Sequence, residues 1–113
     1  LQNMGFLHVG NNQWKLSPAF DLNPFPDKER ESKTWLSEDT GPITSVRQLV
    51  EQARRFELSP LETKTVIAKV VQAVMQWKEV AMSADVGMQQ EELLAFKPAF
   101  ESAALEDAKK FSR

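Results

Sequence analysis

The strongest constraint on the fold of this 113-residue chain is a helical pattern that starts at Ser59. Ser59, Pro60 and Glu62 are typical of an N-cap, a first helical residue and the returning carboxylate of a capping box. Polar residues then recur at alternating gaps of three and four, with mostly apolar residues between them: Glu62, Thr65, Lys69, Gln72, Gln76, Glu79 and Ser83. This pattern predicts the central helix of a bundle, which ends before Gly87. The helix should be exposed to solvent along one narrow stripe and buried on most sides.

Shorter helical patterns lie on both sides of this segment. Residues 46–56 place their apolar side chains on one face, and Ser45 with Gln48 is typical of a capping box. In the tail, apolar residues keep a helical period across Pro98. Because a proline inside a helix clashes with the carbonyl four residues before it, we predict two tail helices, residues 89–96 and 98–111.

The first part of the chain has a different composition, because it holds most of the Gly, Pro and Asn. Residues 6–9 and 14–16 are strand-like, and residues 10–12 tolerate the positive φ of a tight turn. Residues 25–44 are predicted to form a long surface loop, with a short strand near residues 34–36. We therefore expect a mainly α fold in a single truncated domain: a short N-terminal β-hairpin and loop over residues 1–44, then a small helical bundle over residues 45–113.

Composition excludes several classes of function. The chain has no cysteine, so disulfides, thiol catalysis and thiolate metal sites are ruled out. Its net charge of −2 argues against direct nucleic-acid binding, which usually needs a basic excess. A helix-turn-helix around residues 56–60 is also disfavoured, because the helix that follows is too apolar to lie in a DNA groove. No apolar run approaches the ~18 residues of a membrane span, so no membrane association is expected.

Side chains capable of catalysis are few. The single histidine, His8, lies in a strand-like run without a recognisable partner, so we interpret it as an ordinary hairpin residue. We predict that the following charged side chains are solvated: Asp39, Arg47, Arg54, Arg55, Glu91 and Glu92. The arginines among them could also bind an acidic partner.

Asn3 and Asp21 are the notable pair, because they flank the predicted hairpin, which would fold them towards each other. Amide and carboxylate oxygens are ligands that Mg²⁺ takes when it is held jointly with phosphates. However, Asn before Gly and Asp before Asn-Pro are also typical turn residues. Spacing alone therefore favours a turn rather than a metal site.

Residues 1–7, LQNMGFL, and 17–24, SPAFDLNP, resemble the C-terminal lobe of HipA-like serine/threonine protein kinases, the toxins of bacterial toxin–antitoxin pairs. That family's catalytic loop reads roughly Asp-Asp-His-x-x-Asn, then Gly-Phe-Leu, a hairpin and Ser-Pro-Ala-(Tyr/Phe)-Asp-Leu-Asn-Pro. The resemblance implies that Asn3 and Asp21 bind Mg²⁺ that bridges the ATP phosphates. Gln2 and Met4 depart from the charged or His residues of many members, but neither change removes a metal ligand.

The resemblance implies a whole protein that transfers the γ-phosphate of ATP to a protein Ser or Thr in the bacterial cytoplasm, with Mg²⁺ and ATP as cofactors. The catalytic Asp would precede Asn3, outside this sequence. We therefore expect the chain by itself to be inactive, to contain no catalytic residue and to bind neither cofactor tightly. The expected partners are the remaining kinase lobe, an antitoxin and a protein substrate.

An alternative is a non-catalytic helical interaction module, residues 45–113, that docks an antitoxin or another protein. The sequence upstream of Leu1 separates the two hypotheses, because an Asp-Asp-His run there would support the kinase.

Overall fold

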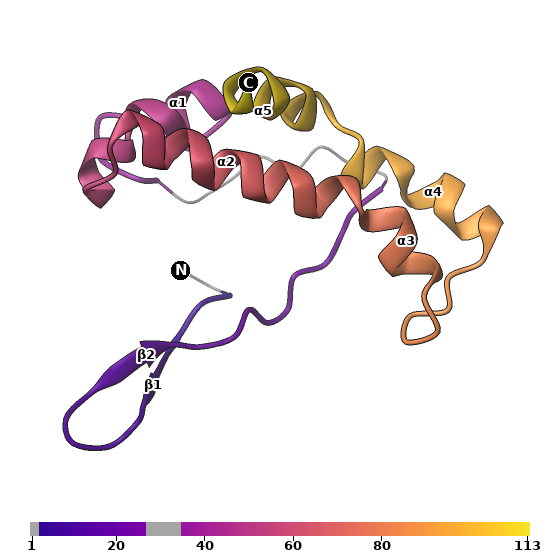
Figure 1. The fold of residues 1–113 in the computed structure, drawn as a ribbon, viewed down its shortest axis with the longest axis horizontal. Coiled ribbons are helices and arrows are strands. Elements are labelled where there is room, and N and C mark those ends of the chain that lie inside the picture. Colours follow the sequence, from indigo (N-terminus) through magenta and orange to yellow (C-terminus); the bar gives the residue numbers. More distant parts are fainter. Residues whose placement is uncertain (1–2, 27–34) are drawn as a thin grey trace.

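The computed structural model describes residues 3–26 and 35–113. Its elements, in chain order, are β1 (Phe6–His8), β2 (Trp14–Leu16), α1 (Val46–Glu51), the 3₁₀ helix η1 (Ala53–Phe56), α2 (Pro60–Met75), α3 (Trp77–Met82), α4 (Gln90–Phe100) and α5 (Ala103–Ser112). The predicted mainly α fold with an N-terminal hairpin is confirmed. Figure 1 shows α5 packed on α2 with α1 beside it, α3 and α4 beyond the other end of α2, and the hairpin projecting away from the helices. Within these residues, no helix is both long and apolar enough to cross a membrane.

The hairpin forms where the sequence predicts it. Its strands are antiparallel, with Phe6 opposite Leu16 and His8 opposite Trp14. The turn between them has φ values of 91°, 47° and 59° at Gly10, Asn11 and Asn12. These left-handed conformations suit glycine and asparagine, and they explain why the turn residues could be recognised from the sequence.

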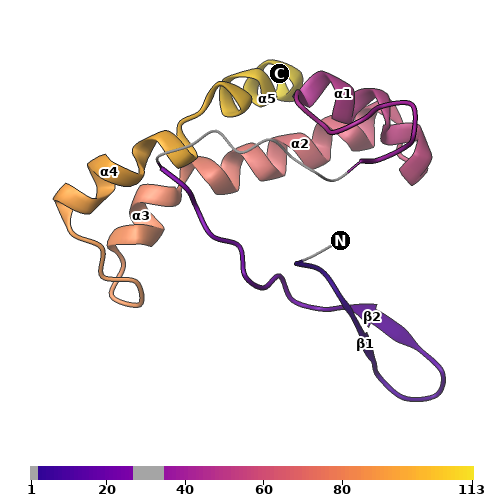
Figure 2. The same ribbon diagram turned by 180° about the vertical axis from the view of Figure 1, so that it is seen from behind.

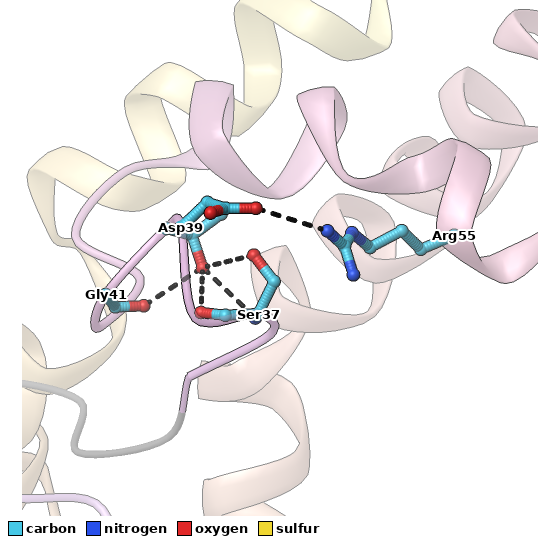
Figure 3. A network of polar contacts seen from close by, with 5 residues as sticks. Ser37, Asp39, Gly41 and Arg55 are labelled. Carbon is cyan, nitrogen blue, oxygen red and sulfur yellow. Dashed lines mark hydrogen bonds and ion pairs between the residues drawn. The ribbon is translucent and has the colours of Figure 1, made fainter.

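The described part of the following loop is a small turn that contacts η1. The hydroxyl of Thr40 accepts a hydrogen bond from the Ser37 N–H at 3.2 Å and donates one to the Ser37 carbonyl at 3.1 Å. Asp39, on the same turn, lies 3.7 Å from the guanidinium of Arg55, as Figure 3 shows. Of the strand predicted at residues 34–36, the described residues contain a single bridge between Trp35 and Pro42, and position 34 lies outside them.

The helix predicted over residues 46–56 is wrong in its second half, which is the 3₁₀ helix η1. The Ser45 hydroxyl does accept a hydrogen bond from the Gln48 N–H, at 3.3 Å. The Gln48 side chain, however, accepts from the Thr44 N–H at 2.8 Å, so the capping box is not formed with Ser45. At the other end, Glu57 adopts φ 58° and the Leu58 N–H bonds to the Ala53 carbonyl at 3.2 Å. This closed final turn stops the helix and redirects the chain into α2.

The start of α2 is confirmed, including its capping box. The Ser59 hydroxyl accepts from the Glu62 N–H at 3.3 Å, and the Glu62 carboxylate accepts from the Ser59 N–H at 2.8 Å. The predicted continuation to Ser83 is wrong, because the helix is interrupted at Gln76 and α3 begins at Trp77. The interruption accompanies the burial of Trp77, which packs with Ala81 and Leu93 in the core shared by α3 and α4.

The prediction that α2 is buried on most sides is also wrong. Only Thr63 and Val71 of α2 are buried. Leu61, Val66, Val70 and Met75 are among the large apolar side chains that stay exposed, at 74%, 47%, 56% and 58% respectively. The reason is that α5, with α1 packed beside it, covers one side of α2, as Figures 1 and 2 show from opposite directions, and the described residues place no second layer on the other side.

The predicted break at Pro98 is wrong as well, because α4 runs through it to Phe100 and α5 starts at Ala103. Pro98 removes the hydrogen bond to the Leu94 carbonyl, but both residues are exposed, so water can reach that carbonyl. Continuing the helix to Phe100 stacks its ring on Trp77, with centroids 4.6 Å apart and planes 6° apart. The passage of α4 through Pro98 thus accompanies aromatic packing at the end of the helix.

The capping box of α2 predicts a pH dependence of stability. Hydrogen bonds from the Ser59 hydroxyl and the Ser59 N–H lower the pKa of Glu62 in the folded chain. A carboxylate with a lowered folded pKa stabilises the fold above its unfolded pKa, and that contribution is lost as the pH falls through the folded pKa. We therefore expect the stability difference between the unmodified chain and Glu62→Gln to be constant near pH 7 and to shrink below about pH 4.5. Urea unfolding of both chains at pH 7, 5 and 3 measures this difference in stability. A difference that does not vary with pH would contradict the stabilising role of the Glu62 carboxylate.

Candidate metal-binding site at the base of the hairpin

The hairpin brings together the two residues that the sequence predicts as a pair. Beyond the strands, the Ser17 N–H donates to the Gly5 carbonyl at 2.8 Å, so the antiparallel pairing extends towards the hairpin base. At the base, Asn3 Nδ2 donates a hydrogen bond to the backbone carbonyl of Asp21 at 2.6 Å. The hairpin thus returns the chain to the neighbourhood of Asn3, and this hydrogen bond joins Asn3 to Asp21.

Asp21 lies in an unusual backbone conformation, with φ 53°. Left-handed geometry is uncommon outside glycine, although Asp and Asn adopt it more readily than other residues do. Asn23 holds this turn, because its Nδ2 donates to Asp21 Oδ1 at 2.7 Å and to the Asp21 carbonyl at 3.3 Å. The side chains of Asn3 and Asn23 therefore both bond to Asp21, and the carboxylate is held at the surface by a neighbouring amide.

A cleft of about 550 Å³ opens at this point. Its walls come from two distant parts of the sequence: Asn3 and Asp21–Phe25 at the base of the hairpin, and Ala99 and Phe100 at the end of α4. The helical part of the chain therefore contributes directly to the candidate site. The sequence signalled this only indirectly, because the apolar period across Pro98 indicated a packed face without indicating what it faces.

The donor atoms are suited to a hard cation. Asn3 uses its nitrogen in the hydrogen bond to Asp21, so its Oδ1 remains as an acceptor, and the Asp21 carboxylate carries a second oxygen besides the one bonded to Asn23. Amide and carboxylate oxygens are what Mg²⁺ takes alongside phosphate and water. In the described parts of the chain, no group of three or more His, Cys, Asp or Glu could hold a metal ion. Asn3 and Asp21 thus fit part of a Mg²⁺ site, and phosphate oxygens, water or further protein would have to supply the other ligands.

Several of the other candidate side chains make local contacts. His8 lies in β1 with its ring 5.1 Å from that of Trp14, as a hairpin residue. Glu92 accepts from the Gln89 N–H at 2.7 Å and so caps α4. Arg47 lies 5.7 Å from the ring centroid of Phe111.

Comparison with protein-family models, with curated proteins and with solved structures found no match to this chain. The resemblance of residues 1–7 and 17–24 to HipA-like kinases therefore stays a prediction. The local geometry supports it: Asn3 and Asp21 lie at the base of one hairpin, the Asn3 side-chain amide donates to the Asp21 backbone carbonyl, and both residues line one cleft.

Proposed function

We propose that this chain carries the Mg²⁺-binding end of the active site of a HipA-like protein kinase, which transfers the γ-phosphate of ATP to protein Ser or Thr. The hydrogen bond between Asn3 Nδ2 and the Asp21 carbonyl carries the proposal, because it joins the two motif residues that the family resemblance assigns to the metal. The proposal extends to bacterial cytoplasm as the location and to the remaining kinase lobe, an antitoxin and a protein substrate as partners.

In this proposal, Asp21 contributes negative charge and Asn3 contributes a neutral amide oxygen to the metal. When bound, Mg²⁺ would neutralise charge that develops on the transferred phosphate. The chain's own residues position these oxygens: the hydrogen bond from Asn3 to the Asp21 carbonyl holds the two residues together, and Asn23 orients the Asp21 carboxylate. The hydroxyl-orienting Asp would come from sequence that precedes Asn3 in the family pattern.

The exposed apolar surface of the hairpin supports the proposal that a further kinase lobe packs against this chain. All six strand residues are exposed, and Phe6 and Trp14 are 66% and 63% exposed. A two-stranded hairpin is at best marginally stable in water, and clustered exposed apolar side chains are typical of a surface that another part of a protein covers. The remaining kinase lobe would provide such a cover on both faces of the hairpin.

The direct test compares two polypeptides with radiolabelled ATP and Mg²⁺. One is the 113-residue chain, and the other also contains the sequence encoded immediately upstream of it. We expect the longer polypeptide to label itself or a protein substrate on Ser or Thr, and the 113-residue chain to show no kinase or ATPase turnover. Robust turnover by the 113-residue chain, or an upstream sequence without the Asp-Asp-His run, would count against the proposal.

The apolar surface of the helices favours a second candidate function, a helical interaction module for an antitoxin or another protein. Besides the exposed face of α2, a cleft of about 610 Å³ lies between η1, α2 and α5, with an apolar lining that includes Leu58, Ile67 and Phe111. A longer polypeptide that binds its antitoxin through residues 45–113 and transfers no phosphate would support this candidate over the kinase.

A further inference from the structure

The end of α4 forms one wall of the cleft that contains Asn3 and Asp21. Phe100, the last residue of α4, lines this cleft, although it lies far from Asp21 in the sequence. The turn across the cleft is exposed and left-handed at Asp21, and polar contacts from Asn3 and Asn23 hold it. An apolar wall beside such a turn excludes the conformations in which the turn would occupy the same space.

The ring of Phe100 packs against the helical core. It stacks almost parallel on Trp77, with 4.6 Å between centroids, and Trp77 is only 6% exposed. Directly after Phe100, Glu101 forms an ion pair with Lys78 at 2.6 Å and a longer one with Lys97 at 3.7 Å. The cleft wall is thus connected to the α3–α4 core by stacking and by an ion pair that joins the end of α4 to α3.

We propose that Phe100 is a positioning residue for the metal-binding turn, which couples the helical core to the orientation of the Asp21 carboxylate. The expected effect of Phe100 on Mg²⁺ affinity rests on the proposed function. Its structural part, the restraint of residues 21–25, can be measured without any metal. Phe100 itself offers no ligand atom and acts only through the turn that it faces.

Phe96 provides a matched control on the same helix. Both rings pack against the buried cluster of Trp77, Ala81 and Leu93, but only Phe100 lines the cleft with Asp21. A loss of general core packing should therefore appear in Phe96→Ala and Phe100→Ala alike. An effect of the cleft wall should appear in Phe100→Ala alone, and Phe100→Tyr, which retains an aromatic ring for the stack, should restore it.

The first measurement is the backbone ¹⁵N order parameter, S², of the 113-residue chain without metal. We expect S² at residues 22, 23 and 25 to fall below about 0.6 in Phe100→Ala, and to be nearly the same as in the unmodified chain in Phe96→Ala and Phe100→Tyr. An equal decrease in Phe96→Ala, or no decrease in Phe100→Ala, would overturn the proposal.

The second measurement is the Mg²⁺ dependence of ADP binding by the longer polypeptide, followed by calorimetry. Residues that orient a metal ligand typically change metal affinity by about 10- to 100-fold, so we expect Phe100→Ala to require at least about tenfold more Mg²⁺ than Phe96→Ala. Equal Mg²⁺ requirements in the two variants would overturn the positioning role. If the unmodified polypeptide shows no Mg²⁺ dependence while Phe100→Ala still loosens residues 21–25, the kinase function fails and the restraint by Phe100 stands.

Discussion

Replacing Asp21 by alanine in the longer polypeptide is expected to lower phosphoryl transfer by at least about 100-fold. Loss of one group that stabilises developing charge in an enclosed site typically costs about 10²–10³ in rate, and a carboxylate on the metal is such a group. The fold should survive, because the Asp21 side chain is exposed and its carboxylate bonds only to the nearby Asn23 among the contacts described. The rate of phosphoryl transfer is measured with radiolabelled ATP, and a far-UV circular dichroism spectrum shows whether the fold is retained.

Asp85→Ala is the matched control for the loss of one carboxylate. Asp85 is exposed in the turn between α3 and α4 and takes no part in the cleft, so its replacement should leave the rate unchanged.

Asp21→Asn separates the effect of charge from that of shape, because it keeps the size of the side chain and removes its negative charge. We expect it to be nearly as slow as Asp21→Ala. An Asp21→Ala polypeptide as active as Asp85→Ala would refute the assigned role of Asp21.

Replacing Trp77 by alanine should have the largest effect on stability. Trp77 is 6% exposed, belongs to the only buried cluster identified in the described residues and stacks on Phe100. Truncating a buried aromatic side chain to alanine costs about 3–5 kcal/mol, a large fraction of the 5–15 kcal/mol that typically separates folded and unfolded states. Urea unfolding of the 113-residue chain should show this decrease in the free energy of unfolding.

Trp14→Ala is the control, since it makes the same chemical change at a side chain that is 63% exposed. Trp14 contacts His8 across the hairpin and contributes to no buried cluster, so we expect a loss below about 1 kcal/mol in this chain. If Trp14→Ala and Trp77→Ala destabilised the chain equally, the core would not lie between α3 and α4 as described.

Local chemistry made much of the fold predictable. The Gly-Asn-Asn turn, the two strands of the hairpin and the Ser59–Glu62 capping box all depend on residues close together in the sequence, and each forms as expected. The same locality made the approach of Asn3 to Asp21 predictable, because an antiparallel hairpin necessarily returns its two ends to one place.

Tertiary packing decided the rest. Periodicity would carry α2 through Gln76, and the local chemistry of proline would break α4 at Pro98, yet the helices do the opposite at both positions. Trp77 accounts for both differences, since its burial accompanies the new helix α3 and its stacking with Phe100 favours the passage of α4 through Pro98. The exposure of α2 could not be predicted from the sequence either, because a helical pattern shows which face is apolar but not whether another element covers that face.

By itself, the sequence determined the hairpin, the helical character of the remainder and the meeting of Asn3 with Asp21, because each rests on local turn, capping and register chemistry. Only the tertiary structure decided that Phe100 stands at the cleft beside Asp21. That placement depends on contacts between residues that are distant in sequence, foremost the stack on Trp77, and no local propensity encodes such contacts.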